Sequence, residues 1–413
     1  MASPRILHLS TYDANGGAAR AAVAIHRALQ GAGISSRMRV GHSALNDPAI
    51  IANKKYPFML AKEADRRLWS LQTSETNTWR SPARFGSITA QEINSSSADI
   101  VHLHWVTDGF MSVETIGKIT KPIVWSLCDA WAFSGAEHYA TDVTAIRASE
   151  GYTKDNRPTT DAGLDIDRWT WARKFRSWKS QMHLVPASAW LTESVEKSSL
   201  MGDWPISRIP HVVDTDVFAP MTQGLARKIT GIPNDKPVVL FLSSGNIFDY
   251  RKGWDLLIHA VNSPAITQPL TIVVVGPRPT AHVQRAISQT SKHSFLFFGE
   301  AHGDEQLVAL YNSADLTAVP SREDNMPITA MESQSCGTPV LSFCIGGLPD
   351  IVQHEVSGYL AKAGNVADLS QGVNWILGSG SRDIARAHAL NTWSGTVVTP
   401  QLLDVYQMAL GNH

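Results

Sequence analysis

The sequence predicts an α/β protein built from two doubly wound domains. Short apolar runs alternate with helical patterns throughout, as expected where helices connect parallel strands. The strand-like runs form two series, and the polar segment 211–224 separates them. Open α/β sheets bind ligands at the carboxyl ends of their strands. We therefore expect the two domains to face each other across a cleft that holds the ligand.

Length and composition indicate a soluble globular protein. The chain has 413 residues, of which 43% are hydrophobic and 18% charged, and this length is sufficient for two cores. A formal net charge of -1 argues against nucleic acid as a partner, which usually requires a basic surface. The longest apolar runs are strand-sized, and the N-terminus lacks a signal-peptide pattern. We expect a cytoplasmic protein, with any membrane contact peripheral and at the inner face of the cell membrane.

The two series of runs set the expected domain boundaries. Residues 1–212 form the N-terminal domain, which a C-terminal helix at 398–413 completes, and residues 213–397 form the C-terminal domain. The first series predicts a helix at 18–30 and strands at 6–10, 100–104, 122–127, 183–187 and 207–210. The second series predicts strands at 238–243, 270–275, 294–298, 316–320 and 339–343.

The segment 140–180 fits neither series. Trp171, Phe175 and Trp178 recur there at helical spacing and give one aromatic face. An amphipathic helix that packs its aromatic residues on the core explains this pattern. A surface for an anionic lipid head group also explains it, with positive charge from Arg168, Arg173, Lys174, Arg176 and Lys179.

Two strand-to-helix turns carry residues that suit a phosphate ligand. Gly16 and Gly17 precede the first helix, where the missing Cβ lets the backbone approach a ligand closely. This turn lacks the complete G-x-G-x-x-G pattern, and a glycine pair also makes an ordinary tight turn. Arg251 and Lys252 open a later helix, where two cations would neutralise a diphosphate. A solvated helix start is the alternative.

The segment 321–343 predicts a sugar-nucleotide site. It reads as strand end, polar loop, helix from 328 to 335 and a further strand. Met326 and Pro327 lie at the helix entry, where N–H groups and the helix dipole favour an anion. Asp324 and Glu332 lie eight positions apart. Their carboxylates would flank a bound phosphate ester and accept hydrogen bonds from sugar hydroxyls.

Four motifs resemble those of the family 4 retaining glycosyltransferases, which have the GT-B fold. They are IPHVVDTDVFAP, RKGWDLLIHA, SREDNMPITAMESQSCGTPV and GGLPDIVQHEVSGYLA. They follow the family's order and spacing, and the resemblance covers nearly the whole chain. GGAARAA and HLHWV further resemble the branch that builds capsular, colanic-acid-type and other exopolysaccharides.

The resemblance implies a role for each matched residue. The C-terminal domain would bind the donor: Glu332 at the ribose, Asp324 at the sugar, and Lys252 with Arg251 at the diphosphate. Further donor contacts would come from Gly16, Gly17, Asn246, Glu323, Asn325, Met326 and Pro327. The N-terminal domain would hold the acceptor, bordered by Asp13, His104, Trp105, Cys128 and the loop from Asp129 to His138.

The chain departs from the family pattern at three positions. Asp324 stands where glutamate is usual, with Glu323 next to it able to substitute, and Asn246 stands where an arginine is frequent. Cys128 replaces a histidine that commonly contacts the donor sugar. A buried, unreactive thiol is the favoured interpretation of Cys128, because a nucleophile needs a cationic partner. The nearest candidates to replace the imidazole are His138, His104 and Asp129. Of these, Asp129 and His138 are expected to join Lys252, Arg251 and Asp324 in catalysis.

No metal site and no cofactor are predicted. His102 and His104 alternate on a strand and share a face, but no third ligand is spaced to join them. The D-x-D patterns at 165–167 and 214–216 resemble the metal site of another glycosyltransferase fold. GT-B relatives use basic residues and helix N-termini in place of a metal. The nucleotide diphosphate sugar would be a co-substrate.

The resemblance implies transfer of a hexose, with retention, from a nucleotide diphosphate sugar to a hydroxyl of a glycan or lipid-linked acceptor. The expected setting is bacterial cell-surface polysaccharide synthesis. Two other classes stay open: a GT-B epimerase or hydrolase acting on the same donor, and a non-catalytic sugar-nucleotide-binding subunit. The residues leave open the base, the sugar, the acceptor and the oligomeric state.

Overall fold

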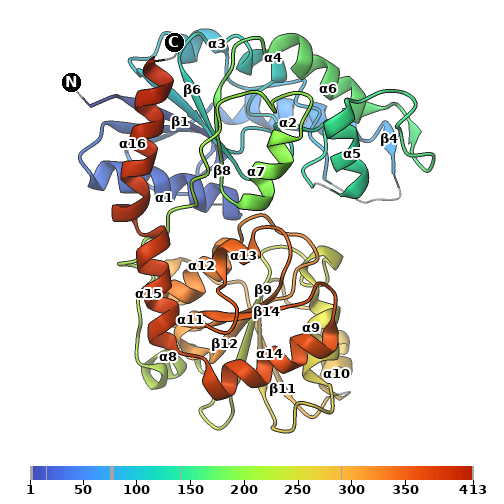
Figure 1. Ribbon diagram of the computed structural model, residues 1–413, viewed down its shortest axis with the longest axis vertical. Helices are drawn as coiled ribbons and strands as arrows, with labels where there is room; N and C mark the ends of the chain where they lie inside the picture. The colour runs from blue at the N-terminus through green and yellow to red at the C-terminus, as the bar shows by residue number, and fades with distance from the viewer. Residues whose placement is uncertain (1–2, 15, 75–78, 140, 290, 412–413) are drawn as a thin grey trace. The chain divides into compact units, whose positions relative to one another are not determined.

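The computed structural model describes residues 3–14, 16–74, 79–139, 141–289 and 291–411 of the chain, which divides into two compact units (Figure 1). Unit 1 comprises Met1–His211 and Val398–His413, and unit 2 comprises Val212–Val397. Of the predicted C-terminal segment 398–413, residues 412–413 lie outside the described residues.

Unit 1 is built on a parallel six-stranded sheet in the order β3-β2-β1-β5-β6-β8. Its central strands are buried on both faces, which explains their nearly continuous apolar sequences. The strands are β1 (Ile6–Tyr12), β2 (Ser36–His42), β3 (Ile50–Ala52), β5 (Ile100–Leu103), β6 (Ile123–Leu127) and β8 (His183–Pro186). The helices are α1 (Gly17–Gly31), α2 (Lys55–Trp69), α3 (Ala90–Asn94), α4 (Val113–Ile116), α5 (Asp142–Glu150), α6 (Ile166–Ser177) and α7 (Ala189–Glu196).

Two further parts complete unit 1. A short antiparallel pair joins β4 (Gln72–Thr73) to β7 (Ala162–Gly163) beside α5 and α6. The last helix, α16 (Gly395–Gly411), is the upper red helix of Figure 1. Its buried Tyr406 hydroxyl lies 2.7 Å from His102 Nδ1 on β5, so this hydrogen bond attaches the end of the chain to the first sheet.

Unit 2 repeats the same topology. Its sheet has the order β11-β10-β9-β12-β13-β14, with every pairing parallel. The strands are β9 (Val238–Leu242), β10 (Thr271–Val275), β11 (Ser294–Gly299), β12 (Leu316–Val319), β13 (Val340–Phe343) and β14 (Gly358–Ala361). The helices are α8 (Gln223–Thr230), the 3-10 turn η1 (Tyr250–Lys252), α9 (Trp254–Val261), α10 (Ala281–Gln289), α11 (Asp304–Ser313), α12 (Ile328–Ser335), α13 (Leu348–Ile351), α14 (Val366–Ser379) and α15 (Arg382–Trp393).

The predicted α/β class of two doubly wound domains is confirmed. In both sheets the strand order reverses beside the first strand of the unit, as in a Rossmann-like sheet, so loops after neighbouring strands meet at the carboxyl edge. The predicted strand at 207–210 is wrong. This segment runs along β8 and donates to it from Ser207 N and Ile209 N, but the one bridge, at Ile206, is isolated. Pro205 before the segment and Pro210 at its end lack N–H donors, which limits the ladder.

In the part of the chain that the structure describes, none of the helices is long and apolar enough to cross a membrane.

Candidate functional site

In unit 2, the structure brings the predicted cations to the predicted acid across 72 positions of sequence. Lys252 Nζ donates a 2.8 Å hydrogen bond to Asp324 Oδ2, and Arg251 Nη1 lies 3.7 Å from the same oxygen. Arg251 Nη1 also donates to the backbone carbonyl of Glu323 at 3.1 Å. η1 and the loop before α12 therefore form one charged site.

Two glycines allow these segments to approach. Gly253 has φ of +69°, and a Cβ there would lie 1.9 Å from the carbonyl oxygen of Pro320. Gly346 has φ of +52°, and a Cβ there would lie 2.0 Å from the carbonyl oxygen of Asp324. Larger residues would separate the segments. The glycines of the RKG and GGLPDIV motifs thus have a shared structural role.

The charged site is half-buried, and its charges are balanced locally. The side chains of Lys252, Arg251 and Asp324 are 26%, 22% and 14% exposed. Burial would raise the pKa of Asp324, but the charges of Lys252 and Arg251 outweigh it and lower this pKa below its usual value. Arg251 Nη2 also lies 3.8 Å from Asp249 Oδ2, so two cations face two carboxylates, and an incoming anion can compete for the cations.

α12 begins directly after this site. Pro327 is its N-cap, and the preceding Met326 is buried. The first N–H groups of an α-helix lack partners within the helix and attract anions. One turn further on, Glu332 is 3% exposed, and its Oε2 accepts a 2.9 Å hydrogen bond from the Tyr311 hydroxyl. Glu332 is thus held in a fixed rotamer by α11.

The other predicted donor residues lie in loops. Asn246 is exposed, and its side chain accepts from Phe248 N in the turn after β9. Asn325 is half-buried in the loop before α12. Gly16, with φ of +86°, is the N-cap of α1 in unit 1, and Gly17 is the first residue of that helix.

In unit 1, three of the predicted residues form a hydrogen-bonded group. His138 Nδ1 lies 2.6 Å from Asp129 Oδ2, and Trp105 Nε1 donates to the same oxygen at 2.9 Å. The other ring nitrogen, His138 Nε2, lies 2.7 Å from Ser81 Oγ, which reaches Thr107 Oγ1 at 3.2 Å. The imidazole is therefore fixed at both nitrogens.

Beside this group lies a small cavity of about 10 Å³. It is lined by His104, Trp105, Thr107, Leu127, Cys128, Asp129 and Trp131, among others. Its volume is sufficient for about one water molecule. Burial raises the pKa of the Cys128 thiol, and the charge of Asp129 raises it further, so the reactive thiolate is disfavoured.

Asp13 has a structural set of contacts. Its carboxylate accepts hydrogen bonds from Ser43 Oγ, from Ala44 N at 2.9 Å and from Leu45 N at 3.2 Å. These contacts fix the turn after β2. Asp13 is buried, so its charge stabilises the loop around it.

The expectation that no third ligand joins His102 and His104 is wrong. His8, on the neighbouring strand β1, completes a buried group whose ligand atoms lie within 4.8 Å of one another. These rings already bond within the protein: His8 Nδ1 lies 2.9 Å from His104 Nε2, and His102 binds Ser126 and Tyr406. Sequence spacing missed the group because parallel pairing brings its third member from another strand.

The basic and aromatic segment forms α6, with part of its charge directed inward. Trp178 is buried, and Trp171 stacks on Phe175 with ring centroids 5.3 Å apart. Arg173 and Lys174 are also buried. The interpretation of α6 as a basic lipid-facing surface is therefore wrong for these two residues, and the core-packing interpretation holds for Trp178.

Sequence reasoning missed Ser81, Thr107, Tyr311 and Ser321, which hold the predicted side chains in place. Ser321 Oγ donates to Asp324 Oδ2 at 3.3 Å, three positions away. Ser81 lies 57 positions before His138, and Tyr311 lies 21 positions before Glu332. The only signal available was for Ser321, which belongs to the same motif as Asp324.

A family model matches part of unit 2. Residues 223–389 match the family model described as glycosyl transferases group 1. The matched residues all lie within unit 2. The matched range includes Lys252, Asp324 and Glu332, and so covers the charged site and α12.

Curated relatives match about half of the chain. The D-inositol 3-phosphate glycosyltransferase of Mycolicibacterium smegmatis is 31% identical over 210 residues, covering 49% of this chain and 47% of the relative. That of Salinispora arenicola is 36% identical over 206 residues, covering 46% and 45%. The chain spans about half the length of the curated relatives it matches.

Solved structures resemble the chain over its whole length. Sucrose-phosphate synthase from Thermosynechococcus elongatus has a TM-score of 0.67 at 16% identity, covering 99% of this chain and 100% of that one. Anabaena Alr3699/HepE in complex with UDP and glucose has a TM-score of 0.64 at 16% identity, covering 98% and 100%. The chain has the GT-B fold.

Proposed function

We propose that this protein is a retaining glycosyltransferase that moves a hexose from a nucleotide diphosphate sugar to a hydroxyl of a glycan or lipid-linked acceptor. The observation that carries the proposal is the Lys252–Asp324 contact at the entry of α12, within the residues that match the group 1 glycosyltransferase model. A diphosphate would displace Asp324 as the partner of Lys252 and Arg251. α12 would add its first N–H groups.

Sugar transfer from such a donor requires stabilisation of the departing diphosphate while positive charge develops on the sugar. Preorganised cations and helix N–H groups supply that stabilisation without rearrangement during the reaction. In this proposal Glu332 holds the ribose, and Asp324 turns to the sugar hydroxyls. The acceptor attacks the sugar on the face from which the diphosphate leaves, and a leaving phosphate oxygen takes the acceptor's proton. No carboxylate nucleophile is needed, and the anomeric configuration of the sugar is retained.

For unit 1 we propose the acceptor side, bordered by Asp129, His138 and Trp105. We place the reaction in the cytoplasm, in bacterial cell-surface polysaccharide synthesis, without a resident metal or cofactor. The names of the curated relatives add D-inositol 3-phosphate to the acceptors worth testing. The UDP and UDP-glucose complexes of Alr3699/HepE add UDP-glucose to the donors.

The test begins with a thermal-shift screen of nucleotide diphosphates and their sugars, since a ligand that binds the folded state raises the melting temperature. The donor that binds is then followed by NMR, alone and with a panel of acceptors. The proposal is supported if the donor is lost only when an acceptor is present and the new glycosidic bond has the same anomeric configuration as the donor. Rapid conversion of donor without any acceptor indicates an epimerase or hydrolase, and tight binding without turnover indicates a binding subunit.

A further inference from the structure

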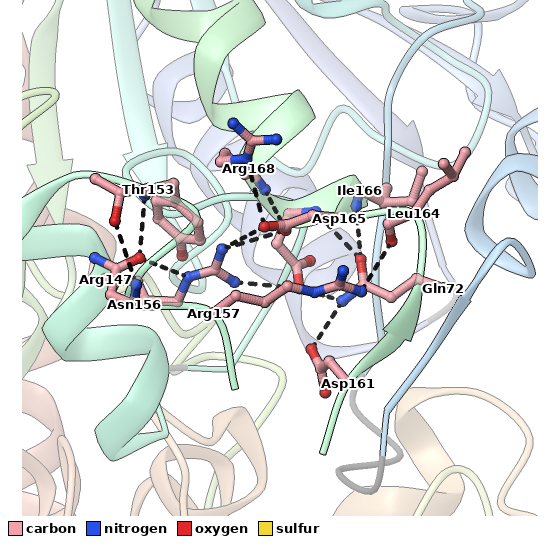
Figure 2. Close-up of polar contacts among 12 residues, drawn as sticks. Gln72, Arg147, Thr153, Asn156, Arg157, Asp161, Leu164, Asp165, Ile166 and Arg168 are labelled. Atoms are coloured by element: carbon pink, nitrogen blue, oxygen red, sulfur yellow. Dashed lines mark hydrogen bonds and ion pairs between the residues drawn. The ribbon is translucent and has the colours of Figure 1, made fainter. Parts of the chain in front are cut away.

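α6 is anchored at its first turn before it reaches the acceptor-side loops. Its N-cap Asp165 accepts from Arg168 N, and Arg147 of α5 donates to Asp165 Oδ2 at 2.9 Å. Gln72 of β4 accepts from Ile166 N at 2.7 Å and donates to Asp161 at 3.1 Å. Figure 2 shows these side chains turned toward one another around the start of the helix. The helix is therefore a fixed support.

Lys174, in the third turn of α6, is buried with 0% exposure. Its Nζ donates to three backbone carbonyls: that of Trp131, that of Ser134 at 3.2 Å and that of Gly135 at 2.7 Å. The same nitrogen lies 3.9 Å from the ring centroid of Trp131 and 5.6 Å from that of Trp178. Three acceptors and two aromatic faces surround one nitrogen.

This arrangement matches an ammonium group. A protonated lysine offers three N–H donors, one for each carbonyl, whereas a neutral amine offers two. Aromatic faces also attract a cation. Burial lowers the pKa of Lys174 well below its usual value, although the charges of Glu137, Asp129 and Asp167 act in the opposite direction. The carbonyls and indole faces favour the charged form.

The three carbonyls belong to the loop whose two ends carry Asp129 and His138. The ends are tied by the Asp129–His138 contact of 2.6 Å and by a hydrogen bond from Ala130 N to the His138 carbonyl. Lys174 therefore lies inside a closed loop whose two ends carry Asp129 and His138. Removing its charge would leave three carbonyls buried without their donor, which is costly.

Arg173, one position earlier, holds the opposing segment. Its guanidinium donates to the carbonyls of Pro82 at 2.7 Å and Ala83 at 2.8 Å, and it forms two hydrogen bonds with Glu114. Ala83 has a positive φ of 44°, an uncommon conformation that this contact helps to maintain. Ser81, which bonds His138 Nε2, precedes this segment.

We infer that Lys174 is a positioning residue: an internal ammonium ion that shapes the 129–138 loop and thereby positions Asp129 and His138 on the proposed acceptor side. The inference rests on the proposed transferase for its functional consequence, but its structural content stands apart from it. Arg173 fixes the matching segment that carries Ser81. Lys174 and Arg173 of α6 thus stabilise two segments of the proposed acceptor side through buried contacts with backbone carbonyls.

The experiment compares Lys174→Met, which keeps most of the side-chain length and removes the charge, with Lys174→Arg, which keeps the charge. The matched control is Lys179→Met, because Lys179 also contacts a carbonyl and an aromatic ring but is exposed. Three readouts are taken: the imidazole NMR signals of His138, assigned with His138→Gln; donor affinity by calorimetry; and kcat, acceptor KM and the pH profile of transfer.

Lys174→Met is expected to change the His138 signals and to lower kcat by roughly 10- to 100-fold, since small displacements of reacting groups have effects of this size. Donor affinity should stay within about twofold, because a placement error of this kind acts on the acceptor. Lys174→Arg should recover part of the loss, and Lys179→Met should match the wild type. Unchanged His138 signals with an unchanged pH profile in Lys174→Met would overturn the inference.

Two further measurements keep the outcome decisive. If Lys174→Met does not fold, the ¹⁵N signal of Lys174 Nζ in the wild-type chain is measured at neutral pH. A slowly exchanging ammonium supports the inference, and a neutral, rapidly exchanging amine contradicts it. If the wild-type chain transfers no sugar to any acceptor, the proposed function fails, while the His138 and Nζ signals still decide the role of Lys174.

Discussion

Two lysines, one in each unit, show opposite uses of the same charge. Lys252 of unit 2 is 26% exposed and faces a carboxylate, Asp324. Lys174 of unit 1 is fully buried and faces three carbonyls and two indole rings. A carboxylate partner can be exchanged for a phosphate oxygen with the lysine still at the surface. Buried backbone carbonyls cannot be replaced by a ligand, so Lys174 stabilises the fold and is not available to bind one.

This difference separates the charge that a ligand can use from the charge that shapes a site. Breaking an ion pair at a half-buried position has a small effect on stability. Removing one member of a buried charged group is expensive, because its partners stay unsatisfied in a medium of low dielectric. Substitutions in unit 2 should therefore change activity and ligand affinity, whereas substitutions in the buried polar groups of unit 1 should change stability and loop geometry as well.

The largest expected effect is that of Lys252→Ala. Loss of a preorganised charge at the leaving group should lower kcat by about 100- to 1000-fold at saturating donor, with little change in melting temperature. The control is Lys228→Ala, an exposed lysine of α8 in the same unit. Turnover of Lys252→Ala at the wild-type rate would remove this lysine from the leaving-group role.

The same contrast explains which site residues could be predicted from the sequence. The donor-side residues lie in contiguous motifs, where Asp324, Met326, Pro327 and Glu332 share one strand–loop–helix unit, and the predicted helix 328–335 is the observed α12. Tertiary pairings carry no such signal: Ser81 meets His138 across 57 positions, and His8 meets His104 across 96. The inward direction of Lys174 was also hidden, because helical spacing identifies a face but not which neighbour covers it.

A second test of the donor side is Glu332→Gln. The side chain keeps its shape and its hydrogen bond with Tyr311 but loses the charge that would strengthen bonds from ribose hydroxyls. A hydrogen bond to a charged group contributes about 1.5–3 kcal/mol, so nucleotide affinity should fall by roughly 10- to 100-fold in calorimetry. Glu305→Gln, at an exposed position in the first turn of α11, is the control. Equal affinity in both variants would place the ribose elsewhere.

On the acceptor side, Tyr406→Phe tests whether a buried polar contact of unit 1 is structural. The substitution leaves His102 Nδ1 buried without the hydroxyl that lies 2.7 Å away, which should lower the free energy of unfolding by about 1–3 kcal/mol. Tyr56→Phe removes the hydroxyl of a tyrosine that is 79% exposed and should change nothing. Urea unfolding measures both. Equal stability of the two variants would show that α16 does not depend on this contact.

The smallest expected effect is the pH dependence of the Lys252–Asp324 pair. Lys252 and Arg251 lower the pKa of Asp324 in the folded state, so the folded chain binds this proton less tightly than the unfolded chain does. The resulting stabilisation is fully present above the ordinary aspartate pKa of about 4. It is lost as the pH falls through the lower, folded pKa.

We expect the stability difference between wild type and Asp324→Asn to be at most about 1 kcal/mol at pH 7 and to shrink below about pH 4. Urea unfolding between neutral and acidic pH measures it, with Asp235→Asn, a 62% exposed aspartate, as control. A difference that grows on acidification would mean that Asp324 is not stabilised as a carboxylate, and the competition between this carboxylate and a diphosphate for Lys252 would lose its basis.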